Sequence, residues 1–579
     1  MHRNRYLTFF LVFLLSFLIV PGLVTLAAQD SDGDGVPDAE DQYPGRNDLK
    51  YGGTLTLIRA EEPTSLDSLR TPFGDQIHQY ISEPALMWSP GGEFGPAGWV
   101  ESFEQSEDET TLTFHLREGV TFHDGADLDA EAFAWLLRER MRDDSIFSMP
   151  LGNVPDTDHI KILDDYTVQI EQSKPWPELP YNMSTPAWVG AMETPRALEK
   201  YGEDYGYSEV YGNGPFEFKE WAKRDHITLT RYEEYDWAPD WAWKYSDAES
   251  KEDYTSGPPF LEKVVFEYVP EASTRVNMLK SGGADGIIEV PKSQVKDLEQ
   301  MDNVEIMSQS SYRIRYVGYN TTVAPLDELK VRKALNYATN RKAMVQVVYF
   351  GYADPAYSLY CGKDLETSNT KLLYKFDPTK AQELLEEAGW EDSNGDGIRD
   401  KDGEKLSFEL MTRNTREFRQ MANMLQAMWR NIGIEAEVRL LDTATVRSSM
   451  EEGDHEAVIH EHQWVTKQDM YPWWFNPDYK PYPYESLLET EKIHELNEKA
   501  MAASNLDEMK KTIDDLVNYY YEEAALGALV RPQNLLAVKD NVKNVVPAHK
   551  NGGNWFWTPY LYDVYLQDVY EQNKAKAQN

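Results

Sequence analysis

A run of aspartates near the start of the chain has the spacing of a calcium-binding loop. Carboxylates stand at positions 1, 3, 5, 9 and 12 of the loop, with glycine at position six: Asp30, Asp32, Asp34, Asp38 and Asp41. Ca²⁺ is a large, hard cation that accepts many oxygen ligands at modest geometric cost, so we predict a Ca²⁺ site here. Position 12 is Asp instead of the usual bidentate Glu, and a solvated acidic linker is therefore the alternative.

A second acidic loop occupies residues 392–403. It has oxygen-bearing side chains at Asp392, Asn394, Asp396 and Asp400, but the twelfth position is Gly403. The ligand set is incomplete, so a polar hairpin-like turn between a helix and a strand is the favoured interpretation.

The histidines give little support to catalysis. His460 follows His455-Glu456 by five residues, whereas the zinc motif HExxH needs one helical turn. The intervening residues 457–459 are typical of a strand, on which His460 and His462 would share a face, so a metal site stays open as an alternative. The sequence has no nucleophile elbow, P-loop or dinucleotide fingerprint, and we therefore predict that the protein is not an enzyme.

Aromatic residues gather between Trp464 and Tyr484, where there are eight of them together with four prolines. The prolines exclude a single buried helix. Aromatic rings on a loop present flat apolar faces that suit a sugar ring or the side chains of an extended peptide. Packing beneath a long loop is the alternative role for most of these rings.

Length and charge limit the classes of function. The chain has 579 residues, enough for two or three domains, and a formal net charge of −42. Such a surface repels phosphate backbones and anionic lipids, which excludes nucleic acid as a partner. The single cysteine, Cys361, excludes an internal disulfide framework.

The N-terminus has the pattern of an export segment. His2, Arg3 and Arg5 precede an uncharged run that ends in small residues at Ala28, so we predict export with cleavage near that point. The same run is long enough to anchor the chain if it is not cleaved. No cysteine stands at the cleavage point, which excludes a lipid anchor there. Residues 29–48 would form an acidic tether.

Periodicity predicts alternating strands and helices, an α/β fold. Residues 111–116 alternate as in a half-buried strand, and Asp129 stands as the N-cap of a helix over residues 130–141. Asn340 and Asp377 begin further helices, and the run after Gly53 is typical of an edge strand.

These elements carry three longer patterns. Residues 112–141 read LTFHLREGVTFHDGADLDAEAFAWLLRERM, residues 212–216 read GNGPF, and an N…P…VR.AL.YA..R pattern begins at Asn320. Together they resemble the family-5 extracytoplasmic solute-binding proteins, which are the oligopeptide, dipeptide, nickel and oligosaccharide receptors of ABC importers. The resemblance covers nearly everything after residue 50.

The resemblance implies a three-lobed, periplasmic-binding-protein-like α/β fold. Lobe I would comprise residues 49–85, 214–310 and 530–579, lobe II residues 86–213, and lobe III residues 311–529. The ligand would lie between lobes I and III, which close by hinge bending. A monomeric receptor outside the cytoplasm, with the membrane permease as its partner, is the implied assembly.

The resemblance also implies where ligand contacts lie. We predict contacts from residues after the strand that leads to the cleft and from two further positions: Trp464, Asp469, Trp473, Trp474, Asn320 and Arg413. In peptide-binding relatives an acid three residues after the tryptophan holds the ligand's amino group, whereas this chain has Lys467. An oligosaccharide therefore stands beside a peptide as the expected ligand, with a secreted carbohydrate-active enzyme and a nickel-chelate receptor as the alternatives.

Overall fold

The computed structural model describes residues 46–69, 77–142, 151, 153–176, 179–184, 192–463, 486–503, 505–547 and 559–578. The predicted export segment and the five aspartates of the first acidic loop lie outside these ranges. Within them, no helix has the length and apolar character needed to cross a bilayer.

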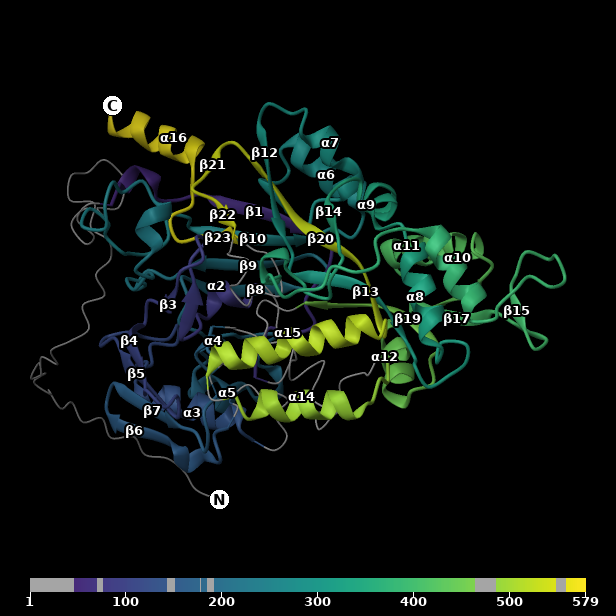
Figure 1. The fold of residues 1–579 in the computed structure, drawn as a ribbon. Coiled ribbons are helices and arrows are strands. Elements are labelled where there is room, and N and C mark those ends of the chain that lie inside the picture. Colours follow the sequence, from purple (N-terminus) through teal and green to yellow (C-terminus); the bar gives the residue numbers. More distant parts are fainter. Residues whose placement is uncertain are drawn as a thin grey trace, which may run out of the picture.

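A twelve-stranded sheet runs through the molecule (Figure 1), in the order β18-β17-β19-β13-β20-β11-β1-β10-β9-β8, with β12 and β14 also on β20. We name its parts the first half-sheet (β1, β8–β12) and the second half-sheet (β13, β14, β17–β19). The strands of the first are β1 Thr54–Arg59, β8 Phe216–Ala222, β9 His226–Arg231, β10 Lys263–Tyr268, β11 Gly286–Ile288 and β12 Val304–Ser310. Those of the second are β13 Arg313–Tyr319, β14 Ala353–Pro355, β17 Ser407–Arg413, β18 Glu435–Leu441 and β19 Ala457–Gln463.

One strand belongs to both half-sheets. The 14-residue β20, Leu526–Lys539, pairs with β13 and β14 at its N-terminal end and with β11 and β12 at its C-terminal end. The β12–β13 connection runs beside β20, and there both the backbone N and the Oγ of Ser311 donate to the carbonyl of Pro532. Two adjacent extended strands thus join the half-sheets.

A separate four-stranded sheet lies in residues 100–171, in the order β4-β5-β7-β6 (Figure 1). Its strands are β4 Val100–Gln105, β5 Thr111–Leu116, β6 Ile160–Asp164 and β7 Thr167–Glu171. Helix α3, Ala130–Arg140, packs against it, and Phe133 of the helix meets Phe114 of β5 edge to face, with 5.3 Å between the ring centroids.

Helices bury apolar faces on both half-sheets. In the second, α8, α10 and α11 share one core in which Leu335, Leu385 and Trp429 are fully buried. Besides α3, the longer helices are α6 Ala272–Ser281, α8 Leu329–Ala338, α9 Arg341–Tyr349, α10 Pro378–Glu387, α11 Arg416–Arg430, α12 Thr443–Glu452, α14 Glu491–Met501, α15 Leu506–Glu522 and α16 Gln567–Ala577. The shorter ones include α2 His78–Ile81, α5 Pro195–Tyr201 and α7 Val295–Leu298.

The predicted helix starts are confirmed. Asp129, Asn340 and Asp377 each accept a hydrogen bond from the backbone N–H three residues on, which satisfies a donor that the first turn leaves free. The second acidic loop ends in a hairpin formed by β15 Asp400–Lys401 and the following β16 Glu404–Lys405, as the polar-turn interpretation predicted.

The prediction of an edge strand after Gly53 is wrong. Strand β1 is paired on both sides, in parallel with β10 and with β11, and Leu55, Leu57 and Ile58 are buried. A strand buried on both faces in a parallel arrangement is nearly all apolar, and the threonines at its start obscured this pattern.

The GNGPF turn needs glycine because two backbones come into contact. The N–H of Gly214 donates to the carbonyl of Ile81 at 2.8 Å. A Cβ built on Gly214 would lie 2.6 Å from the carbonyl oxygen of Tyr80 and 2.7 Å from the carbonyl carbon of Ile81. Backbone atoms cannot move aside as a side-chain end can, so this turn fixes α2 against the start of β8.

Replacement of Gly214 by alanine is therefore expected to lower the free energy of unfolding by about 1–3 kcal/mol, the usual cost of overpacking. Gly95→Ala is the control, since a Cβ there meets nothing within 4 Å. Urea unfolding followed by tryptophan fluorescence compares the two. Equal midpoints for the two variants would contradict the proposed backbone contact.

Candidate ligand-binding site

The sequence-predicted contacts divide into two groups. Trp464, Asp469, Trp473 and Trp474 lie outside the described residues, and their role stays a prediction. Asn320 and Arg413 are described. They occupy the second half-sheet, at the ends of β13 and β17.

The side chain of Asn320 is occupied by the protein itself. Its amide donates to the carbonyl of His455 at 2.8 Å, and its oxygen accepts from the N–H and hydroxyl of Thr322. With no exposed surface, Asn320 fixes the junction of β13 and β19. Its contact with a ligand stays a prediction.

Arg413 retains hydrogen-bonding capacity. Its Nη2 lies 2.7 Å from Oε1 of Glu461, and its guanidinium carbon stands 4.2 Å from the centre of the Phe418 ring. The Nε–H is buried and has no hydrogen-bond partner among the described residues. A buried donor without a partner is costly, so this Nε–H is a candidate contact for an acceptor outside the described residues.

Arg413 belongs to a chain of alternating charges. Glu461 of β19 also accepts from Nε of Arg315 at 3.0 Å, since the two residues face each other across the β13–β19 pairing. Arg315 Nη1 in turn lies 2.5 Å from Oε2 of Glu417, in the first turn of α11. Lys292 ends the chain, with its ammonium 3.6 Å from Oε1 of Glu417.

The ends of this ion chain come from different half-sheets. Lys292 lies directly after β11, in the 3-10 turn Lys292–Gln294, whereas the other four members belong to the second half-sheet and its helix α11. We use the name ion chain for Lys292, Glu417, Arg315, Glu461 and Arg413. It holds three cations and two carboxylates, an excess of one positive charge.

The electrostatics agree with charged carboxylates in the ion chain. Burial would raise the pKa of Glu461, but the guanidiniums of Arg315, Arg313 and Arg413 overcome it and hold that pKa well below its ordinary value. The pKa of Glu417 is also lowered, because Arg315 and Lys292 outweigh its desolvation. Desolvation lowers the pKa of Lys292, against the opposing attraction of Glu417. The three cations outnumber the two carboxylates, so their charge favours a further anion beside them.

Both histidines of β19 contact Tyr316. His462 stacks on Tyr316 with 5.7 Å between ring centroids, and Nδ1 of His460 lies 3.3 Å from the hydroxyl of Tyr316. Across the described ranges, no group of three or more His, Cys, Asp or Glu side chains is arranged to hold a metal ion. The described residues therefore give no support to the hypothesis of a nickel-chelate receptor.

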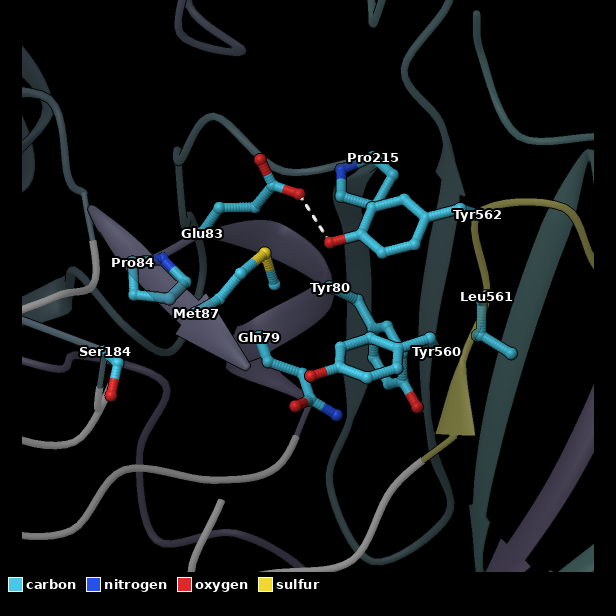
Figure 2. A pocket seen from close by; sticks show the side chains of 10 residues that line it. All are labelled: Gln79, Tyr80, Glu83, Pro84, Met87, Ser184, Pro215, Tyr560, Leu561 and Tyr562. Carbon is cyan, nitrogen blue, oxygen red and sulfur yellow. Dashed lines mark hydrogen bonds between the residues drawn. The ribbon is translucent and has the colours of Figure 1, made fainter. Parts of the chain in front are cut away.

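A cavity lies away from the ion chain, between α2 and residues 559–562. It is small, with a volume of about 20 Å³, and Glu83, Tyr80, Tyr560 and Tyr562 form part of its wall (Figure 2). Glu83 Oε1 accepts from Tyr562 at 2.7 Å and from Tyr235 at 2.8 Å, whereas Oε2 is buried with no partner among the described residues. Burial raises the pKa of Glu83 to about 7, although both tyrosines oppose the rise.

Comparison with known proteins now identifies the family. The model of the bacterial extracellular solute-binding proteins, family 5, matches residues 97–483. The chain belongs to this family. It is 34% identical over 295 residues to a glutathione-binding protein of Salmonella paratyphi A, covering 51% of this chain and 53% of that one. A glutathione-binding protein of Escherichia coli strain K12 is 31% identical over 353 residues, 61% and 62% of the two chains. The match thus spans less than two thirds of these relatives.

Solved structures confirm the α/β solute-binding-protein fold. An oligopeptide-binding protein of Bacillus subtilis, in complex with a nonapeptide, superposes with a TM-score of 0.71 at 21% identity, over 89% of this chain and 99% of that one. A Campylobacter jejuni protein in complex with Ni(L-His) gives 0.71 at 21% identity, over 88% and 99%. The matched relatives are named as binding proteins.

Sequence reasoning singled out Arg413 as a ligand contact, which stays a prediction, and it missed the rest of the ion chain. Arg315 and Glu461 are 146 residues apart, and Arg315 and Glu417 are 102 apart. The alternation of Arg313 and Arg315 along β13 is the one local signal, and it gains meaning only once β13 is known to pair with β19.

Glu83 generates a prediction on pH dependence. Its folded pKa of about 7 exceeds the ordinary value of 4.5, so the folded state retains the proton longer and stability falls as pH rises between those values. Glu83→Gln keeps an oxygen for the two tyrosines but cannot ionise. The variant should gain roughly 2–3 kcal/mol relative to the natural protein between pH 5 and pH 8.

Urea unfolding at several pH values measures this difference, with Glu104→Gln on the exposed edge of β4 as the control. Parallel curves for the natural protein and Glu83→Gln would show that the buried carboxyl does not hold its proton in the folded state.

Proposed function

We propose that this protein is an extracytoplasmic receptor that captures a short peptide by its terminal carboxylate and delivers it to the permease of an ABC importer. The Nε–H of Arg413 carries this proposal: it is buried at the end of an ion chain with one excess positive charge, and it has no partner in the part of the chain that the structure describes. A carboxylate accepts from a guanidinium through short charge-assisted bonds, and it would supply the acceptor that Arg413 lacks.

Charge balance favours an anionic group over a neutral one at this place. Two further charged groups act on members of the ion chain: Arg313 attracts Glu461, and Glu289 attracts Lys292. They add one charge of each sign. The excess stays at one positive charge among these seven groups. One ligand carboxylate neutralises it, and a neutral sugar or amide does not.

In the proposed binding mode, the two half-sheets close on the ligand from opposite sides. We propose the lobe boundaries that the family resemblance implies. The first half-sheet belongs to lobe I and the second to lobe III, and β20 and the β12–β13 connection act as the hinge. Lobe closure around the solute would make ligand binding and closure one equilibrium, because the ligand contacts both lobes only when they are closed.

The names of the relatives support a peptide. Two are glutathione-binding proteins and another is solved with a nonapeptide, and such ligands carry a free carboxylate. These ligands are properties of those proteins, and the sequence match spans little more than half of the glutathione-binding ones.

The remaining expectations keep the status of predictions. Export by residues 1–28, the Ca²⁺ loop and the aromatic contacts rest on residues outside the described ranges, and so does the case for an oligosaccharide. A monomeric receptor is proposed with the rest of the assembly.

Calorimetric titration with four solutes tests the function: glutathione, trialanine, trialaninamide and cellotriose. The two trialanine forms differ by one negative charge. Trialanine is expected to bind at least about tenfold more tightly than its amide, the usual value of a hydrogen bond to a charged group. Equal affinities would contradict carboxylate recognition, and binding or turnover of cellotriose alone would favour the sugar receptor or the enzyme.

Replacement of Arg413 by methionine should remove most of the preference for trialanine and leave the amide little affected. Arg439→Met is the matched control, since Arg439 lies on the neighbouring β18 in an exposed ion pair with Glu409. A preference that survives Arg413→Met would place the carboxylate elsewhere.

A further inference from the structure

Lys292 is the one member of the ion chain that comes from the first half-sheet. It follows β11 and reaches Glu417 of α11 at 3.6 Å, so this ion pair bridges the two half-sheets. Its ammonium also stands 5.7 Å from the centre of the Tyr349 ring on α9. Four charged groups act on it: Glu417 and Glu289 attract it, and Arg315 and Arg313 repel it.

The bridging pair competes with a stronger one. Glu417 offers Oε2 to Arg315 at 2.5 Å and Oε1 to Lys292 at the longer distance of 3.6 Å. The guanidinium of Arg315 likewise pairs with both Glu417 and Glu461, and the carboxylate of Glu461 pairs with both Arg315 and Arg413. Each charge is shared, so a change at one end of the ion chain alters the pairing at the other.

We propose that Lys292 is a specificity-determining residue. Through its pair with Glu417, Lys292 makes closure of the half-sheets depend on a carboxylate bound at Arg413. A carboxylate that takes over Arg413 releases Glu461 toward Arg315. Arg315 then holds Glu417 less strongly, and Glu417 is freed to pair with Lys292. The ligand's charge thereby strengthens the bond that joins the half-sheets, and a neutral ligand at the same place does not.

The physical basis is differential affinity for the closed arrangement. Closure brings the Lys292 ammonium into a partly desolvated region that already holds Arg313 and Arg315, which is unfavourable unless an anion balances them. A ligand shifts a conformational equilibrium only by as much as it favours one state over the other. The carboxylate of the ligand supplies that difference.

This inference rests on the proposed function, and the test separates the two. The affinities of trialanine and trialaninamide are measured for the natural protein, Lys292→Met and Glu417→Gln. Radii of gyration with and without each peptide report closure by small-angle X-ray scattering. Both variants should lower the acid-to-amide affinity ratio by about fivefold or more, within the usual range of coupling between sites, and should close less on trialanine.

Two controls separate charge relay from a general loss of contact. Lys296→Met removes an exposed lysine from the same segment. Tyr352→Phe removes another bond between the half-sheets, from the Tyr352 hydroxyl to Glu299 at 3.0 Å, without changing any charge in the ion chain. Both controls should keep the acid-to-amide ratio of the natural protein.

The outcomes are distinct. A natural protein with no preference for trialanine overturns the proposed function and this inference together. A clear preference that Lys292→Met and Glu417→Gln both leave unchanged overturns the inference alone. A ratio that falls equally in Tyr352→Phe also overturns it, because any loss of contact between the half-sheets would then suffice.

Discussion

Arg315 occupies the point on which the rest of the site depends. Its guanidinium is nearly buried between the carboxylates of Glu417 and Glu461 and stands 4.7 Å from the Phe418 ring centre and 5.4 Å from that of Tyr349. Burying a charge is costly unless partners surround it, and these partners come from β19, α9 and α11. Burial would lower the pKa of Arg315, but Tyr349, Glu461 and Glu417 outweigh that effect and hold the pKa above its ordinary value.

The fold supplies those partners from distant parts of the chain. Strand β13 places Arg315 beside Glu461 through antiparallel pairing, and the parallel β17–β19 pairing brings the end of β17, with Arg413, to the same edge. Glu417 in the first turn of α11 gains from the positive end of the helix dipole. Strand β20 then holds the first half-sheet in register with the second, and Lys292 reaches the ion chain from across that junction.

Local patterns in the sequence predicted local structure well. The capping residues Asp129, Asn340 and Asp377 specify helix starts through bonds that span three residues, so the chain's own order reveals them. The long signature at residues 112–141 indicated the family, which the comparisons confirm. Arg413 was selected because it follows a recognisable strand, and its contact with a ligand stays a prediction.

The ion chain could not be predicted in the same way. Its members become neighbours through the β13–β19 and β17–β19 pairings and the docking of α11. The contacts of Arg315 with Glu461 and Glu417 join residues more than a hundred positions apart. The edge assignment of β1 failed for a related reason, since both of its neighbours, β10 and β11, come more than two hundred residues later in the chain. Pairing partners at such distances leave no periodic signal in the strand itself.

The central claim is that a carboxylate of the solute completes the buried ion chain between the half-sheets. A crystal structure of the protein with trialanine tests it most directly. The account predicts density for the peptide between the half-sheets, with its terminal carboxylate accepting from the Nε–H of Arg413. A peptide bound elsewhere, or bound there with its amino end toward Arg413, would contradict the account.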